Sequence, residues 1–330
     1  MIRKGLPIIT TILSLLLLVA ASAGYAAEEG GVAGEFTVNS IPIVDSVSLG
    51  AVAITPQQEY TVTITVSDGD QLTDLNTVVL KIWYDSNGGT PTEGEFDSAL
   101  AATDTCAVLT WSSSSGFSIN PSSSTTWSLG SCSAPVSLNV TSDDFDFVFT
   151  VGKVALETTG SALWQIAAKA TDSKSDTGWN YDSSGATIDF YGEVTVPATT
   201  VNWGSIEAGT DFVDIESEEM IGVTLNYIAN GDYDKQVRTS ATWAGGTYTA
   251  TLDSTGTCDD AQEFALQANN TSNRSQAELV DTVGITIDSG GSQTTESGDS
   301  VSTMYLWIKL ASTFNNDIYS GTIVYSIVNG

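Results

Sequence analysis

The chain contains no histidine, and only 10 of its 330 residues are lysine or arginine. Without histidine there can be no Ser-His-Asp or Cys-His triad, no histidine zinc ligand and no imidazole base near neutral pH. The 40 acidic residues outweigh the basic ones and give a net charge of −30, which repels nucleic acid and anionic lipid headgroups. We therefore expect no nucleic-acid partner and no enzyme. Chemistry that uses carboxylates alone, such as glycoside hydrolysis, is the one catalytic alternative left open.

Cysteine is also rare, with three residues in the chain. Cys106 and Cys132 lie in one Ser/Thr-rich region, and in an oxidising compartment this spacing predicts a disulfide between them. The alternative is a pair of buried free thiols. Cys258 has no evident partner in its own half of the chain.

Only the N-terminus carries a long apolar run. Arg3 and Lys4 precede an uncharged stretch from Gly5 to Ala27, and Ala21-Ser22-Ala23 is a small-residue cleavage site. This pattern is typical of a secretory signal peptide and predicts an extracellular or cell-surface protein. Contact with a membrane is expected only through this segment, because no second apolar run is long enough to span one.

A second interpretation of the same segment stays open. Arg3-Lys4-Gly5-Leu6, followed by an apolar stretch, resembles the leader of archaeal type IV pilins. The resemblance implies cleavage before Leu6, a retained apolar helix in a filament core, and a β-sandwich head that faces outward.

The rest of the chain shows strand periodicity. In EYTVTITVSDGD the apolar residues alternate with threonine, and in DDFDFVFTV three phenylalanines recur at every second position. Many such short segments, separated by Gly-rich turns and without alternating helices, predict an all-β fold with two tandem antiparallel immunoglobulin-like β-sandwich domains after an N-terminal apolar helix. Pro197 begins a hinge-like segment. We expect a leader over 1–27 and β-sandwich domains over 28–194 and 195–330.

One polar turn suggests a metal. In VSDGDQLTDL a strand ends in Asp68-Gly69-Asp70, and Asp74 follows four residues later. Carboxylates this close repel one another unless water or a cation lies among them, and calcium takes oxygen ligands of this kind. The stretch resembles the Asp-rich turns of cadherin-like and PKD-type immunoglobulin-like domains. The resemblance implies a calcium site at Asp68, Asp70 and Asp74; a solvated turn without metal is the alternative, and no other cofactor is expected. For a second acidic stretch, EAGTDFVDIESEEM, two interpretations stay open: a cation site or a loop that favours solubility.

Two kinds of residue suggest contact with glycans: exposed aromatic rings, on which sugars stack, and sequons, to which glycans are attached. Trp83, Trp164 and Trp307 lie in apolar strand patterns and are expected in the core, whereas Trp111, Trp127 and Trp179 lie in polar surroundings and are candidates for exposed sugar-stacking rings. Four sequons predict N-glycosylation at Asn139, Asn269, Asn270 and Asn273.

Together these features predict a secreted cell-surface structural or adhesive protein that acts by assembly or binding. In its composition and its many short strand patterns, the chain resembles surface-layer-associated and PKD-like proteins of archaea and bacteria. The expected partners are other copies of the chain, cell-surface components or glycans. The alternatives are a type IV pilin-like filament subunit and an extracellular carbohydrate- or calcium-binding module.

Overall fold

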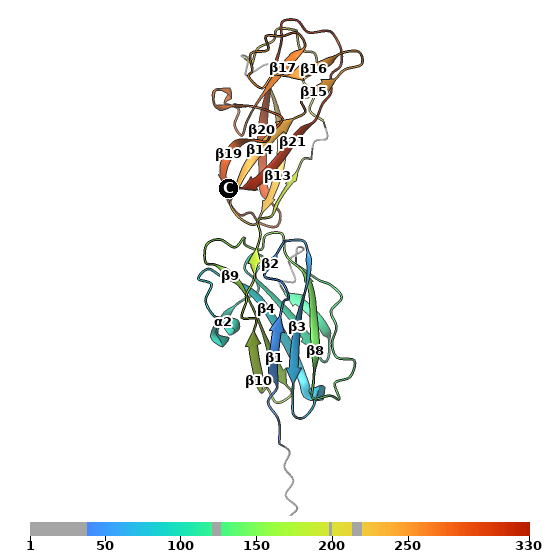
Figure 1. The fold of residues 1–330 in the computed structure, drawn as a ribbon, viewed down its shortest axis with the longest axis vertical. Helices are drawn as coiled ribbons and strands as arrows, with labels where there is room; N and C mark the ends of the chain where they lie inside the picture. The colour runs from blue at the N-terminus through green and yellow to red at the C-terminus, as the bar shows by residue number, and fades with distance from the viewer. Residues whose placement is uncertain (1–37, 121–126, 198–199, 213–219) are drawn as a thin grey trace, which may run out of the picture. The chain divides into compact units, whose positions relative to one another are not determined.

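A computed structural model describes residues 38–120, 127–197, 200–212 and 220–330 (Figure 1). Strands dominate these residues, and the short helical elements are α2 (Glu93–Ser98) and the 3-10 turns η1 (Leu72–Asp74) and η2 (Arg274–Gln276). The predicted all-β class is therefore confirmed. The leader over 1–27 lies outside the described residues, and within them no helix is long and apolar enough to cross a membrane.

Residues 43–188 form two larger antiparallel sheets and one small parallel pair. Their strands are β1 (Ile43–Ser48), β2 (Ala53–Ile54), β3 (Glu59–Ser67), β4 (Leu75–Asp85), β5 (Cys106–Ser112), β6 (Gly116–Asn120), β7 (Ser128–Leu129), β8 (Ser142–Thr150), β9 (Leu163–Asp172), β10 (Thr177–Tyr181) and β11 (Thr187–Ile188). One sheet has the order β1-β3-β8-β7 and the other has the order β10-β9-β4-β5-β6, while β2 pairs with β11 in parallel. Figure 1 shows β1, β3 and β8 side by side.

Period-two alternation explains how these two sheets meet. Val62, Ile64 and Val66 on β3 are fully buried, and they pair in register with the strand that carries Phe145, Phe147 and Phe149, which are also fully buried. The same hydrophobic core includes the inward residues of β4, β5 and β9 from the other sheet. Burial of one face from each sheet is the main apolar driving force for this packing.

Residues 192–195 and 220–329 form a second set of sheets. Their strands are β12 (Gly192–Thr195), β13 (Met220–Ala229), β14 (Tyr233–Thr239), β15 (Thr242–Ala244), β16 (Thr249–Leu252), β17 (Glu263–Asn269), β18 (Glu278–Leu279), β19 (Ile285–Gly291), β20 (Asp299–Leu310) and β21 (Ile323–Asn329). The longer sheet runs β12-β13-β20-β17-β16-β15 with β18 beside β17, and the shorter one runs β19-β14-β21. All pairs in these two sheets are antiparallel except β16 with β17.

A separate hydrophobic core lies among these strands and joins residues of both sheets, including Leu225, Val237 and Leu306. β12 spans the boundary expected between residues 194 and 195, and it pairs with β13. The exact division of the chain into domains stays a prediction.

The sequence patterns missed α2, which covers the outer face of the sheet that contains β4. The helix begins with a capping box, in which the Glu95 backbone nitrogen donates to Thr92 Oγ1 over 3.3 Å and the Glu95 carboxylate accepts from the Thr92 nitrogen over 2.8 Å. Phe96 is buried against Trp83, with their ring centroids 6.3 Å apart. Lys81 Nζ donates to the carbonyl oxygens of Phe96 and Ala99, which satisfies the end of this short helix.

Candidate functional site

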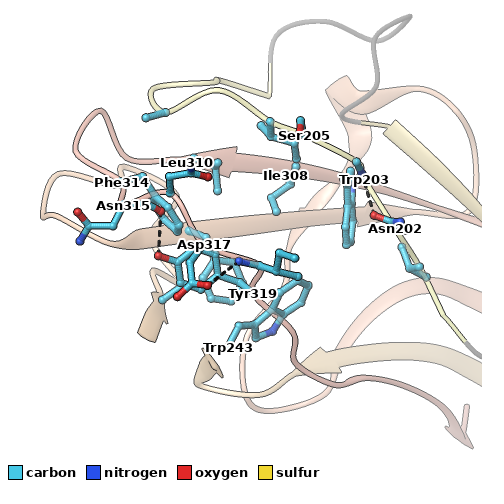
Figure 2. A pocket seen from close by; sticks show the side chains of 18 residues that line it. Asn202, Trp203, Ser205, Trp243, Ile308, Leu310, Phe314, Asn315, Asp317 and Tyr319 are labelled. Atoms are coloured by element: carbon cyan, nitrogen blue, oxygen red, sulfur yellow. Dashed lines mark hydrogen bonds between the residues drawn. The ribbon is translucent and has the colours of Figure 1, made fainter. Parts of the chain in front are cut away.

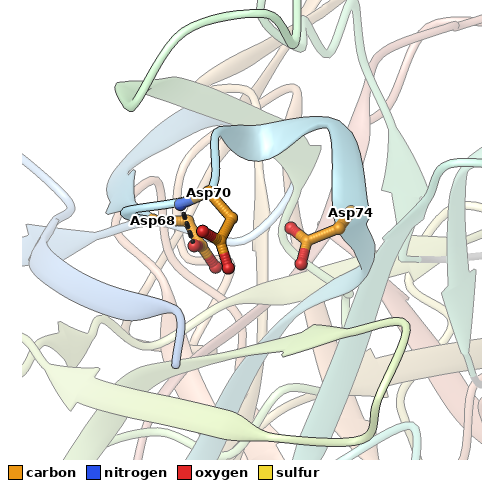
Figure 3. Close-up of side chains that lie close together, drawn as sticks. All are labelled: Asp68, Asp70 and Asp74. Atoms are coloured by element: carbon orange, nitrogen blue, oxygen red, sulfur yellow. Dashed lines mark hydrogen bonds between the residues drawn. The ribbon is translucent and has the colours of Figure 1, made fainter. Parts of the chain in front are cut away.

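The three aspartates of VSDGDQLTDL come together at the junction between β3 and β4. Asp68 directly follows β3, Asp70 lies in the turn, and Asp74 ends η1 immediately before β4. One carboxylate oxygen of each lies within 4.8 Å of the corresponding oxygens of the other two. Figure 3 shows the three side chains pointing toward one another inside the turn. We call Asp68, Asp70 and Asp74 the aspartate cluster.

Hydrogen bonds hold two of these carboxylates in place but leave oxygens unsatisfied. Asp68 Oδ1 accepts from the Asp70 backbone nitrogen over 2.9 Å, and Asp70 Oδ2 accepts from the Ser40 backbone nitrogen over 2.6 Å. Asp68 is only 3% exposed, yet among the described residues its buried Oδ2 has no hydrogen-bond partner, and neither has the buried Oδ1 of Asp74. A buried carboxylate oxygen without a donor is costly, so each one calls for an explanation.

The ionised form of the aspartate cluster is electrostatically unfavourable without a cation. Burial raises the pKa of Asp68, and the charges of Asp70 and Asp172 raise it further. Burial also raises the pKa of Asp74, with the charges of Asp68 and Asp172 adding to the effect. Within the described part of the chain, no lysine or arginine forms a salt bridge with the aspartate cluster. A positive charge among these oxygens would relieve the repulsion.

Asp172 is a fourth carboxylate that the sequence analysis missed. It is the last residue of β9, pairs in register with Leu75 of β4, and is 0% exposed. Its Oδ1 accepts from the backbone nitrogens of Lys174 and Asp176. The signal was present in ATDSKSD, a second strand that ends in an Asp-rich turn, but its proximity to the first turn depends on the pairing of β9 with β4.

The spacing of the cluster suits calcium. Ca²⁺ binds oxygens at about 2.3–2.6 Å, so two ligands on opposite sides of one ion lie at most about 5 Å apart. The three carboxylate oxygens lie within 4.8 Å of one another, close enough for one ion to contact all of them. Three carboxylates supply fewer than the six to eight oxygens that calcium takes, so water or backbone carbonyls would complete the shell. The second acidic stretch, by contrast, lies largely outside the described residues, because 213–219 are not among them.

The structure corrects the predicted disulfide. Cys106, Cys132 and Cys258 are all free thiols, so the Cys106–Cys132 bond is absent. Cys106 on β5 belongs to the apolar cluster of Trp83 and Phe96 on the outer face of its sheet. The thiol of Cys132 instead lies beside β8 of the other sheet, where its Sγ accepts from the Val148 backbone nitrogen. Proximity in sequence did not bring the two thiols to the same face.

The four predicted glycosylation sites differ in accessibility. Asn139 and Asn273 are exposed and Asn270 is half-buried. Asn269 is only 4% exposed, and its Nδ2 donates to Thr271 Oγ1 and to the Asn273 carbonyl oxygen. A glycan attaches through that nitrogen, so the geometry favours Asn139 and Asn273 as acceptors.

The predicted burial of the tryptophan side chains is confirmed for some of them and wrong for others. Trp83, Trp164 and Trp307 are buried as predicted. Trp111 and Trp127 were candidates for exposed rings but are 6% and 2% exposed. Trp111 packs on Phe145 of the facing sheet, and Trp127 packs on Phe149 of the neighbouring strand β8 and on Trp164 of the facing sheet. Trp179 is half-buried and stacks on Tyr181, with ring centroids 5.7 Å apart.

A pocket of about 390 Å³ lies in the second set of sheets (Figure 2). Its floor includes Phe264 of β17 and Ile308 of β20. Trp203, in the segment between β12 and β13, and Trp243 of β15 also line it. The sequence patterns did not point to either tryptophan, because Trp203 and Trp243 are forty residues apart in the chain and meet only in the folded structure.

Comparisons with known proteins do not assign a family. No family model matches the chain, and no curated protein matches it. Among solved structures, the sporulation control protein Spo0M from Bacillus subtilis is similar at a TM-score of 0.26 and 13% identity. The match covers 45% of this chain and 49% of Spo0M, so it spans about half the length of that protein. A similarity this low carries no argument about fold or function.

Proposed function

We propose that this chain is a secreted cell-surface structural or adhesive protein that acts by assembly or binding, with a calcium ion in the aspartate cluster. Its architecture would be two tandem immunoglobulin-like β-sandwich domains. The observation that carries the calcium proposal is the buried, unpartnered Oδ2 of Asp68 among two further carboxylates. The acidic, histidine-free composition supports a binding or structural role over catalysis.

Bound calcium would stabilise the folded protein. The ion neutralises the repulsion among Asp68, Asp70 and Asp74 and fastens the turn between β3 and β4, which belong to different sheets. Extracellular modules with few protein ligands bind calcium with a Kd of about 0.1–1 mM, and we expect that range here. Such an affinity suits a protein that is folded in a calcium-containing exterior.

A calcium titration of the folded protein tests this proposal. At free calcium of about 100 times Kd, binding stabilises the fold by about 2.7 kcal/mol, which raises the Tm of the calcium-linked transition by roughly 5–10 °C. Asp68→Asn removes a charge but keeps an oxygen that can accept from the Asp70 nitrogen, so it should abolish most of the shift. The matched control is Asp45→Asn on β1, an exposed aspartate that is not in the cluster. Equal calcium responses of all three proteins would refute the site.

The N-terminal segment is compatible with two forms of the mature protein, a secreted protein and a filament subunit. Cleavage after Ala23 would release a secreted protein, whereas cleavage before Leu6 would retain the apolar helix and favour a type IV pilin-like filament subunit whose partners are copies of itself. The N-terminal residue of the mature protein, measured by mass spectrometry on material from its native host, separates the two. A start at Gly24 or shortly after it excludes the filament proposal, and a start at Leu6 supports it.

A further inference from the structure

The pocket lined by Trp203 and Trp243 is built from segments that are distant in sequence. The stretch 201–206 forms one wall, and the loop between β20 and β21 forms another. Figure 2 shows Trp203 at one side of the pocket and Phe314 with Asn315 at the other. A volume of about 390 Å³ lies at the lower end of the range typical of small-molecule sites, about 300–1,000 Å³.

Aromatic rings provide rigid apolar surface in this pocket. The ring centroids of Trp203 and Trp243 lie 6.0 Å apart, and Trp243 packs on Phe264 at 4.9 Å. Trp243 is held further by its Nε1, which donates to Thr239 Oγ1 over 3.1 Å. Trp203 and Trp243 are only 7% and 8% exposed, so they form rigid apolar walls of the pocket and leave a small part of each ring open to a ligand.

The polar lining is dominated by amides. Asn202, Asn315 and Asn316 are exposed on the rim, and the side-chain amides of Asn315 and Asn316 form no hydrogen bond within the described residues. Each amide presents two donors and one acceptor. A ligand that carries several hydroxyl groups could use both functions.

Charge disfavours an anionic ligand in this pocket. None of the described lining residues is a lysine or arginine, so an anion finds no partner there. The single lining carboxylate, Asp317, already accepts from the backbone nitrogens of Thr247, Tyr248 and Ile318, at 2.7, 3.1 and 2.8 Å. These donors lower the pKa of Asp317 to about 2, so the side chain stays ionised at neutral pH and repels an anion. Its oxygens are held in the structure of the loop by these backbone donors.

We propose that this pocket binds a neutral carbohydrate of about one or two sugar rings, with the C–H face of a ring against the aromatic lining and its hydroxyl groups on Asn315 and Asn316. A purely apolar ligand would leave the amide rim unused. This site is separate from the aspartate cluster, so it goes beyond the calcium proposal and can hold even if calcium does not bind.

The test is a titration of the full folded chain with a panel of neutral disaccharides: lactose, cellobiose, maltose, mannobiose and N,N′-diacetylchitobiose. Binding is followed by tryptophan fluorescence and calorimetry. We expect at least one of them to bind with a Kd in the millimolar range or below. The double variant Asn315→Ala/Asn316→Ala should weaken that binding at least about tenfold, since both amides are lost. Trp203→Phe keeps an aromatic ring but reduces its area, and should weaken binding by a smaller factor.

Matched controls keep the inference falsifiable. Asn87→Ala removes an exposed amide outside the pocket, and Trp179→Phe changes a tryptophan elsewhere, so both should bind as the unaltered protein does. Circular dichroism confirms that each variant is folded. The inference is overturned if no sugar of the panel binds, if the pocket variants bind normally, or if glucuronic acid or an apolar dye binds there in preference to every neutral sugar. Repeating the titration with Asp68→Asn and in EDTA shows whether the two sites fail together or separately.

Discussion

The Asp70 backbone nitrogen donates to Asp68 Oδ1 over 2.9 Å, while the second oxygen of Asp68 is buried where no donor of the described residues reaches it. The same turn therefore orders one carboxylate oxygen and leaves the other for a ligand. Because Asp74 Oδ1 is also buried and unpartnered, the cluster has two oxygens whose desolvation nothing in the described residues offsets. We therefore expect substitutions in the cluster to change the stability of the fold in opposite directions with and without calcium.

The first prediction concerns pH without calcium. The pKa values of Asp68 and Asp74 are raised above 3.8 by burial and like charges, so the folded state holds protons that the unfolded chain has lost above that pH. The unfolded state then binds fewer protons, and stability falls as pH rises from about 4 through the raised pKa values. In EDTA, Asp68→Asn/Asp74→Asn should lose less stability than the unaltered protein between pH 4 and pH 7, as measured by urea unfolding.

Calcium should reverse this order. The bound ion favours the ionised carboxylates, so the unaltered protein should become more stable than the double variant at pH 7 in calcium, although it is less stable in EDTA. A double variant that is less stable than the unaltered protein in both buffers would show that the cluster is a structural turn and not a metal site.

The second prediction concerns Asp172. Its charge acts on both Asp68 and Asp74, while its own Oδ1 accepts from two backbone nitrogens. Asp172→Asn keeps an acceptor for those donors and removes the charge, so calcium affinity should fall about three- to tenfold without unfolding the protein. Calorimetric titration measures the change, with Asp45→Asn as the control of equal charge. An unchanged Kd would remove Asp172 from the site.

The third prediction concerns the cap of α2. Thr92→Ala removes the hydroxyl that accepts from the Glu95 nitrogen, and loss of such a cap costs about 1 kcal/mol. Urea unfolding should show that loss, whereas Thr90→Ala, two residues before the cap and exposed, should change stability by less than about 0.5 kcal/mol. Equal effects of the two substitutions would mean that the capping box contributes nothing.

The fourth prediction concerns the thiols. Burial raises the pKa of Cys106 and of Cys258 to about 11, and Cys132 is the more exposed of the three. In the folded protein Cys132 should therefore be alkylated first, and the other two only when the structure opens. After denaturation without reductant, mass spectrometry should find all three cysteines alkylated. A peptide pair joined through Cys106 and Cys132 would contradict the structure and restore the predicted disulfide.

The sequence predicted the strands well because alternation is a local property. Val62, Ile64 and Val66 lie on one face of β3 wherever that strand packs, and the three phenylalanines of β8 follow the same rule. The helix α2 was missed because six residues are too few to show helical periodicity, although Thr92 and Glu95 stood at capping-box spacing. Trp111 and Trp127 were misplaced because polar neighbours in sequence do not show which ring packs against the facing sheet.

The sequence by itself determined the all-β class, the acidic and histidine-free chemistry, and the grouping of Asp68, Asp70 and Asp74, because each depends on composition or on residues within one turn. Only the tertiary structure decided that Asp172 joins that charge cluster, that Cys106 and Cys132 stay apart, and that Trp203 and Trp243 line one pocket. The physical reason is that strand pairing and sheet packing bring together residues distant in the chain. Periodicity predicts the face of a strand on which a side chain lies, but it does not predict which strand lies opposite.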